Sequence, residues 1–101
     1  MNNASINAVA ITPLKLLENE HGHLMEVQRR DEEGFPGFGQ TYVTQSFRGV
    51  IKAWYCHRNQ IDQMAVISGF LKLVLYDGRP DSSSFGTVEE IEMGGSNPKL
   101  V

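Results

Sequence analysis

The sequence has one cysteine, one tryptophan and no long hydrophobic segment. Because Cys56 is alone, no disulfide can form within the chain, and the reducing cytoplasm is the expected location. The longest apolar runs are far shorter than the ~20 residues that span a bilayer. Residues 1–15 lack the basic start and the apolar block of a signal peptide. We therefore expect neither a membrane-spanning segment nor a secreted, disulfide-stabilised fold.

An excess of positive charge is also absent. Twelve acidic residues outnumber nine lysines and arginines, which gives a net charge of −3. This charge offers no electrostatic reason to expect nucleic acid or an anionic membrane as a partner. No long window shows helical periodicity. With 101 residues, 41% hydrophobic and 21% charged, the chain is typical of one soluble domain.

Short strands are what the sequence favours instead. The segments richest in β-branched and aromatic residues are 40–47, 49–56, 62–68 and 70–77. Segment 23–30 fits a strand, whereas 30–39 and 77–86 are loops by their glycine, proline, aspartate and serine content. Ser68–Gly69 lies between two apolar runs, where a tight turn needs a residue that tolerates positive φ. Many short strands at close spacing predict an all-β sandwich or barrel.

One set of residues has the spacing of a known motif. The first cupin motif, G(x)5HxH(x)3–4E(x)6G, resembles the run Gly49, Tyr55, His57, Asp62 and Gly69. On an extended strand Tyr55 and His57 would face the same side, because side chains alternate. Two histidines there would make a metal or acid–base site. Two of the motif's ligand positions are changed here, histidine to Tyr55 and glutamate to Asp62.

Three blocks extend the resemblance to the dTDP-4-dehydrorhamnose 3,5-epimerase family of cupins. Its segments D-x-R-G-x-x-x-E, F-x-Q…G-V-L-R-G-L-H and D-x-R-x-x-S-P-T-F-G resemble, in the same order, "NEHGHLME" (19–26), "FGQTYVTQSFRGVIKAWY" (38–55) and "DGRPDSSSFG" (77–86). The resemblance covers residues 14–101 and implies a cupin jelly-roll β-barrel, usually dimeric. We expect a single domain over 1–101, with 1–13 as an N-terminal arm or exchanged strand.

The resemblance also implies roles for individual positions. The family's general-base histidine corresponds to Tyr55, and a phenol, with a pKa of about 10, is a poor base at neutral pH. Two arginines that hold the pyrophosphate correspond to His21 and Lys52, and a lysine corresponds to Asp62. Lysine keeps the charge but loses the bidentate fork. The candidate catalytic residues are Tyr55 and His57. The candidate substrate-binding residues are His21, Glu26, Gln40, Lys52 and Asp62.

Each candidate also has a structural interpretation. His57 and Asp62 would be the ligands if a metal bound, but zinc and iron sites use three or four such groups, so we expect no metal or other cofactor. A hydrogen-bonded histidine is the alternative for His57. We expect Tyr55 to fill the barrel interior and Cys56 to be a small buried side chain.

Two charged groups are expected to be structural. Asp77 and Arg79 should fix their loop through an aspartate side-chain turn and a local ion pair. A cluster of three glutamates near the C-terminal end is interpreted as the solvated face of a strand. Its members are Glu89, Glu90 and Glu92.

In the family a second cupin motif follows, with a catalytic tyrosine, an aspartate that orients the base, and the closing strands. The chain is expected to be truncated before that motif, at "NPKLV". Unpaired sheet edges invite pairing with another chain, so the expected partner is a second copy, in a homo-oligomer.

Three functions follow from these residues. They are an active nucleotide-sugar epimerase or isomerase, a non-catalytic protein that binds a sugar or nucleotide sugar, and an assembly module or truncated product without a small-molecule ligand. The replaced base argues against the first, and the residues leave the other two open. Our working prediction is the non-catalytic sugar-binding protein.

Overall fold

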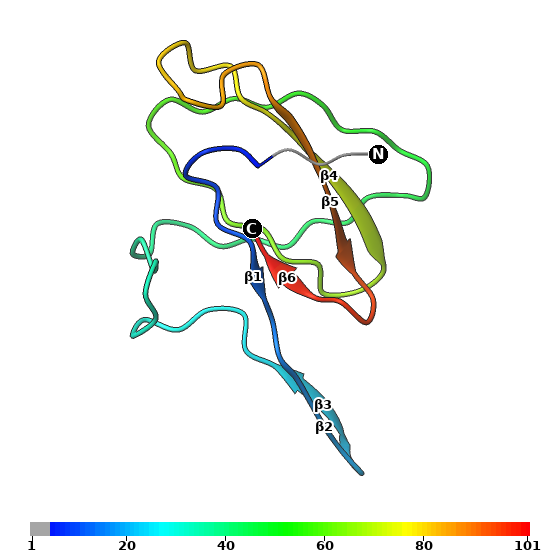
Figure 1. Cartoon of the computed structure of the whole chain (residues 1–101). Coiled ribbons are helices and arrows are strands. Elements are labelled where there is room, and N and C mark those ends of the chain that lie inside the picture. The colour runs from blue at the N-terminus through cyan, green and yellow to red at the C-terminus, as the bar shows by residue number, and fades with distance from the viewer. Residues whose placement is uncertain (1–4) are drawn as a thin grey trace. The chain divides into compact units, whose positions relative to one another are not determined.

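The computed structural model describes residues 5–101, and its regular structure consists of strands (Figure 1). The strands are β1 (Thr12–Pro13), β2 (Leu16–Asn19), β3 (Gly22–Met25), β4 (Phe70–Tyr76), β5 (Val88–Gly94) and β6 (Lys99–Leu100). They form three antiparallel two-stranded sheets, β1–β6, β2–β3 and β4–β5. The prediction of an all-β fold is confirmed. Within residues 5–101, no helix is long and apolar enough to cross a membrane.

The contacts divide the described residues into two units. The first runs up to Val27 and continues with Gln63–Val101, and the second is Gln28–Asp62. All six strands belong to the first unit. The single domain expected over 1–101 stays a prediction, and residues 1–4 of the expected N-terminal arm lie outside the described residues.

The hairpin of β4 and β5 carries the core of the first unit. The strands pair along their whole length, with Lys72 opposite Glu92. Because successive side chains point to opposite faces, the charged pair lies on one face, and Ile91 and Met93 lie on the other. Ile91 and Met93 are buried, as is Ile6 from the N-terminal segment. The strand predicted over 70–77 forms as β4 over Phe70–Tyr76, because β5 pairs with it along its whole length.

Glu89 lies on the buried face of this hairpin. Glu89 is two residues before Ile91 in β5, so the two side chains point to the same face of the strand. The exposed fraction of Glu89 is 6%. The carboxylate Oε1 accepts a hydrogen bond from the Ile6 backbone N–H at 3.0 Å. The expectation that three glutamates form one solvated face is therefore wrong for Glu89. It holds for Glu92, which is exposed, while Glu90 is half-buried.

The loop between β4 and β5 is fixed by Asp77. Asp77 Oδ1 accepts hydrogen bonds from the backbone N–H of Arg79 at 3.1 Å and from its Nε at 2.8 Å. Asp77 Oδ2 accepts them from the hydroxyls of Ser82, at 2.6 Å, and Ser84, at 2.7 Å. Hydrogen bonds from Arg79, and then from the two serines, hold the pKa of Asp77 well below its ordinary value. The predicted side-chain turn and ion pair are confirmed.

The same loop binds the N-terminal segment. Arg79 Nη2 donates to the Asn7 carbonyl at 2.7 Å, and the Ser84 hydroxyl accepts from the Asn7 backbone N–H at 2.7 Å. Together with the bond from Ile6 to Glu89, these contacts hold residues 6–7 against the β4–β5 hairpin.

The sheet of β1 and β6 gains a third segment beyond β6. Met64 and Val101 exchange backbone hydrogen bonds of 2.9 and 3.0 Å, and Ala65 forms an isolated bridge with Leu100. The predicted strand 62–68 is thus reduced to this one bridge. Its composition favours a strand, but few of its residues meet a backbone with which to pair.

A tight glycine contact joins the start of β4 to the end of β5. Gly69 has the positive φ that was expected, +88°, but the hairpin expected there is not formed, since 62–68 does not pair with β4. The Gly69 carbonyl accepts a hydrogen bond from the Gly95 N–H at 3.2 Å. Gly94 has a φ of +100°, and a Cβ there would overlap the Gly69 oxygen. The two backbones can approach this closely because Gly94 has no side chain.

The β2–β3 hairpin turns at residues 20–21. Asn19 lies opposite Gly22, and the Asn19 side-chain oxygen accepts a hydrogen bond from the His21 N–H at 2.8 Å. β3 ends at Met25, so the predicted strand 23–30 is correct only in its first residues.

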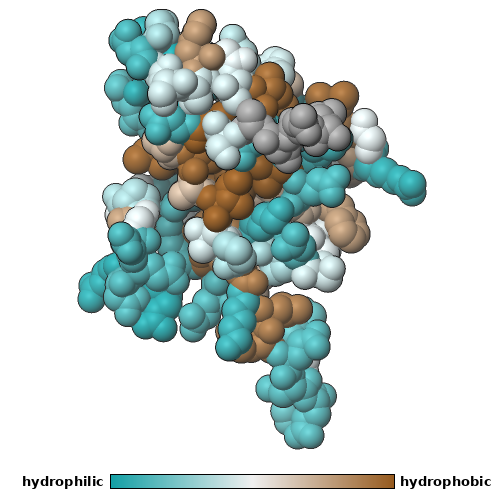
Figure 2. Space-filling model, in the orientation of Figure 1, coloured by the Kyte–Doolittle hydropathy of each residue, from teal (hydrophilic) through white to brown (hydrophobic). Residues whose placement is uncertain are grey.

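The second unit contains no strand in its described residues, all of Gln28–Asp62. The loop predicted over 30–39 is confirmed, but the strands predicted over 40–47 and 49–56 form no β-ladder. Figure 2 shows apolar side chains at the surface in the middle of the face in view, without distinguishing the two units. Those of the second unit that are exposed are Phe38, Tyr42, Val43, Phe47, Val50, Ile51, Trp54, Tyr55 and Ile61. Segments 40–47 and 49–56 have the β-branched and aromatic composition that favours strands, but no neighbouring backbone pairs with them.

Two side chains that were expected to be buried are therefore exposed. They are Tyr55 and Cys56. Both expectations assumed a strand over 49–56 that would place alternate side chains inside a barrel, and this strand is not formed.

Candidate functional site

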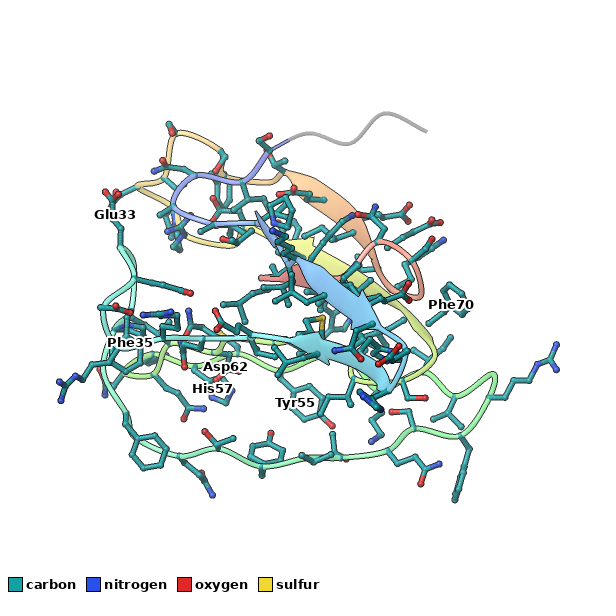
Figure 3. All side chains as sticks on the ribbon, turned by 90° about the horizontal axis from the view of Figure 1, so that it is seen from below. Glu33, Phe35, Tyr55, His57, Asp62 and Phe70 are labelled. Atoms are coloured by element: carbon teal, nitrogen blue, oxygen red, sulfur yellow. The ribbon has the colours of Figure 1, made fainter. Side chains whose placement is uncertain are left out.

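His57 and Asp62 lie against each other in the second unit (Figure 3). The His57 Nε2 is 3.0 Å from Asp62 Oδ2, and the two side chains are 38% and 51% exposed. Gln60 Nε2 donates a hydrogen bond of 2.7 Å to Asp62 Oδ1. All three side chains come from one short segment, 57–62. They form an imidazole–carboxylate pair that solvent and a ligand can reach.

The local chain explains this pairing. A bend at Arg58–Asn59 interrupts the extended direction of the backbone and turns it between His57 and Asp62. An imidazole is the side chain best suited to proton transfer near neutral pH, and a neighbouring carboxylate orients it and stabilises its charged form. The arrangement can accept or donate a proton at the protein surface.

Tyr55, Lys52 and Gln40 lie in the same unit and are exposed. In the described part of the chain, no hydrogen bond or ion pair links any of them to His57 or Asp62. The structure therefore joins His57 with Asp62, and it leaves the phenol, the ammonium and the amide facing solvent.

His21 and Glu26 belong to the first unit. His21 lies in the β2–β3 turn, with its Nε2 3.4 Å from Glu20 Oε1, and both side chains are 85% exposed. Glu26 directly follows β3 and is exposed. The five predicted substrate-binding residues are thus divided between the two units.

No three histidine, cysteine, aspartate or glutamate side chains gather into a metal-binding group within residues 5–101.

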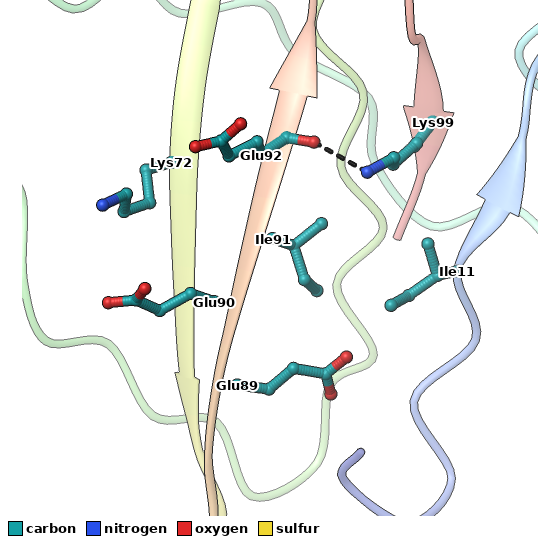
Figure 4. A pocket seen from close by; sticks show the side chains of 7 residues that line it. All are labelled: Ile11, Lys72, Glu89, Glu90, Ile91, Glu92 and Lys99. Atoms are coloured by element: carbon teal, nitrogen blue, oxygen red, sulfur yellow. Dashed lines mark hydrogen bonds between the residues drawn. The ribbon is translucent and has the colours of Figure 1, made fainter. Parts of the chain in front are cut away.

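A surface cleft of about 430 Å³ lies in the first unit beside β5 (Figure 4). It is lined by Ile11, Lys72, Glu89, Glu90, Ile91, Glu92 and Lys99. Lys99 Nζ donates to the Glu92 carbonyl at 2.9 Å. The cleft contains none of the predicted site residues, and three glutamates and two lysines line it.

Gln60 is the member of the His57 cluster that the sequence analysis missed. That analysis looked for ionisable side chains and metal ligands, and an amide is neither. The spacing H-x-x-Q-x-D over residues 57–62 could have indicated it, because an amide can donate to a carboxylate that lies close in the chain.

Two curated proteins are similar to nearly the whole chain. The spore coat polysaccharide biosynthesis protein SpsL of Bacillus subtilis is 35% identical over 96 residues, which is 95% of this chain. A protein of Haloferax volcanii, named as a probable low-salt glycan biosynthesis epimerase, is 28% identical over 99 residues, which is 96% of this chain. The chain spans 64% of the length of each.

The other comparisons found no match. No family model matches the chain, and no solved structure matches it significantly. The chain is therefore similar to proteins named for polysaccharide and glycan biosynthesis, one of them named as a probable epimerase. Its place among the cupins stays a prediction.

Proposed function

We propose that this chain is an epimerase-type protein of polysaccharide or glycan biosynthesis that acts on a nucleotide-linked keto-sugar. The His57–Asp62 pair carries the proposal, because an exposed imidazole held by a carboxylate is the group that ring epimerisation needs. Similarity to a glycan biosynthesis epimerase and to a polysaccharide biosynthesis protein supports the pathway class.

The reaction is a proton exchange at a carbon beside a carbonyl. His57 takes the proton, the C–H electron pair moves into the enolate, and a proton from solvent adds to the opposite face of the same carbon. His57 then releases its own proton to solvent, so the protons balance. No oxidant or reductant is consumed. Asp62 stabilises the imidazolium that forms, and a positioned base of this kind contributes about 10²–10⁴-fold in rate.

Two further candidates of the second unit are proposed as ligand contacts. Lys52 is exposed and offers a point charge to a phosphate, and Gln40 offers a polar group to the sugar or the nucleotide. The substrate contacts expected from His21 and Glu26, which belong to the first unit, stay predictions. Tyr55, two residues before His57, offers a phenol that can donate a proton to the enolate oxygen.

Deuterium wash-in tests the proposal. The protein is incubated in D₂O with a dTDP-4-keto-sugar, and incorporation at the ring carbons is followed by NMR. We expect His57→Gln to reduce incorporation at least ~100-fold. His23→Gln, which replaces a histidine of β3 outside the pair, should leave it unchanged. Equal rates in the two variants would remove His57 from the reaction.

A second candidate is a protein that binds the nucleotide sugar without turning it over. The observation that favours it is Tyr55, a weak base at the position where the family has its catalytic histidine. Calorimetry with dTDP-sugars separates the two functions. Binding heat without deuterium incorporation supports the second candidate, and no heat with any nucleotide sugar contradicts both.

A further inference from the structure

The cleft beside β5 is lined by one buried carboxylate. Glu89 is 6% exposed, and its Oε1 accepts the hydrogen bond of 3.0 Å from the Ile6 backbone N–H. Within residues 5–101, Glu89 has no other hydrogen bond and no ion pair. In this part of the chain, a single neutral N–H is therefore all that offsets the charge of the carboxylate, and its second oxygen, Oε2, has no donor.

The two lysines of the cleft do not neutralise Glu89. Lys72 lies opposite Glu92 in the β4–β5 ladder, and Lys99 Nζ donates to the Glu92 carbonyl at 2.9 Å. Figure 4 shows the Glu92 carboxylate and Lys72 on one side of β5, with Glu89 and Ile91 on the other. This division follows from the alternation of side chains along the strand.

A carboxylate that is withdrawn from water is stabilised by a cation, and a charge-assisted hydrogen bond from an ammonium group is the strong form of that contact. The cleft of about 430 Å³ has the size of a small-molecule site, and Ile11 and Ile91 are its apolar lining. We propose that it binds a small molecule with a primary ammonium group, which donates to Glu89 Oε2 while the rest of the molecule packs against the two isoleucines. The proposal goes beyond the proposed function, since it uses neither His57 nor Asp62.

Two amines test the site and distinguish the sources of the ammonium group. Glucosamine, glucose and butylamine are each titrated into the full chain and followed by NMR. We expect at least one amine to bind with a dissociation constant on the order of 1 mM. Glucose, which has a hydroxyl where glucosamine has the ammonium group, should bind at least tenfold more weakly than the better amine. Tighter binding of glucosamine assigns the site to amino sugars, and tighter binding of butylamine assigns it to aliphatic amines.

A matched pair of variants tests the role of the buried carboxylate. Glu89→Gln keeps the length of the side chain and an oxygen that can accept from the Ile6 N–H, but it removes the charge. We expect it to raise the dissociation constant of the better amine at least tenfold. Glu92→Gln removes the same charge from an exposed side chain of the same cleft, so it should change this constant less than twofold.

The wild type alone supplies a further test, which holds even if Glu89→Gln fails to fold. Binding of the better amine should shift the methyl signals of Ile11 and Ile91. The proposal is overturned if neither amine binds, or if glucose binds as well as the better amine. It is also overturned if the isoleucine signals do not move, or if the two glutamine variants weaken binding equally.

Discussion

The Asp77 side chain is fully buried, and its two oxygens accept five hydrogen bonds from Arg79, Ser82 and Ser84. An amide oxygen cannot replace both carboxylate oxygens, so Asp77→Asn leaves donors unpaired. We expect its melting temperature to fall by about 5–10 °C in calorimetry. Asp81→Asn, at an exposed position of the same loop, should change it little. Equal melting temperatures in the two variants would contradict this role for Asp77.

The same residue predicts an acid dependence. Hydrogen bonds from Arg79, then Ser82 and Ser84, lower the pKa of Asp77 in the folded state from an ordinary value of 3.8. A lowered pKa stabilises the fold fully above the unfolded-state value, and this stability is lost as the pH falls below it. The wild type should therefore lose more stability than Asp77→Asn between about pH 5 and 2 in melting curves. Parallel curves would contradict the prediction.

Sequence separation explains which residue contacts could be predicted. Asp77 and Arg79 are two residues apart, so their turn follows from local chemistry. The bond from Ile6 to Glu89 spans 83 residues, and nothing local indicates it. His57 and Asp62 are close in the chain and were named together as possible metal ligands, but the hydrogen bond from Gln60 to Asp62 was not predicted.

At the level of elements, composition alone predicted β4 and the loop that follows it. The strands expected over 40–47 and 49–56 have the same composition but form no ladder. The difference lies in the partner: β4 meets β5 along its whole length, and the other two segments meet no strand within the described residues. Propensity describes how well a side chain fits a sheet, and pairing decides whether the sheet forms.

The glycine contact between the ends of β4 and β5 gives a test at this scale. A methyl group at Gly94 would overlap the Gly69 oxygen, and its φ of +100° is strained for any side chain. We expect Gly94→Ala to lower the free energy of unfolding by at least about 2 kcal/mol. Gly39→Ala is the control, since a Cβ there has open space and no positive φ. Similar urea midpoints for the two variants would show that the contact is not tight.

For the molecule as a whole, a hydrophobic content of 41% predicted a chain that can bury a core. In the structure, the buried apolar side chains are not shared equally by the two units. The first unit buries Ile6, Ile91 and Met93, while apolar side chains of the second unit stay exposed. Composition determines how much apolar surface a chain has, but it does not determine which apolar side chains pack against one another. The expected cupin barrel needs pairings between distant segments, and these are the contacts that local patterns do not encode.

Exposed apolar side chains of the second unit support the expected self-association, which stays a prediction. Ile51 is 88% exposed, Phe47 77% and Trp54 68%. Burying one such side chain is worth about 1.5–3 kcal/mol, and a contiguous set of them favours a protein–protein contact. We expect a dimer or larger assembly at micromolar concentration in sedimentation experiments.

A charge at the most exposed of these positions should weaken the assembly. Ile51→Glu removes an apolar contact and adds a carboxylate that must lose its water, so the dissociation constant should rise at least tenfold. Gln45→Glu adds the same charge at an exposed polar position of the same unit and should have a smaller effect. A wild-type chain that sediments as a monomer at micromolar concentration would contradict self-association. Equal weakening by both variants would assign the effect to net charge instead of to the apolar surface.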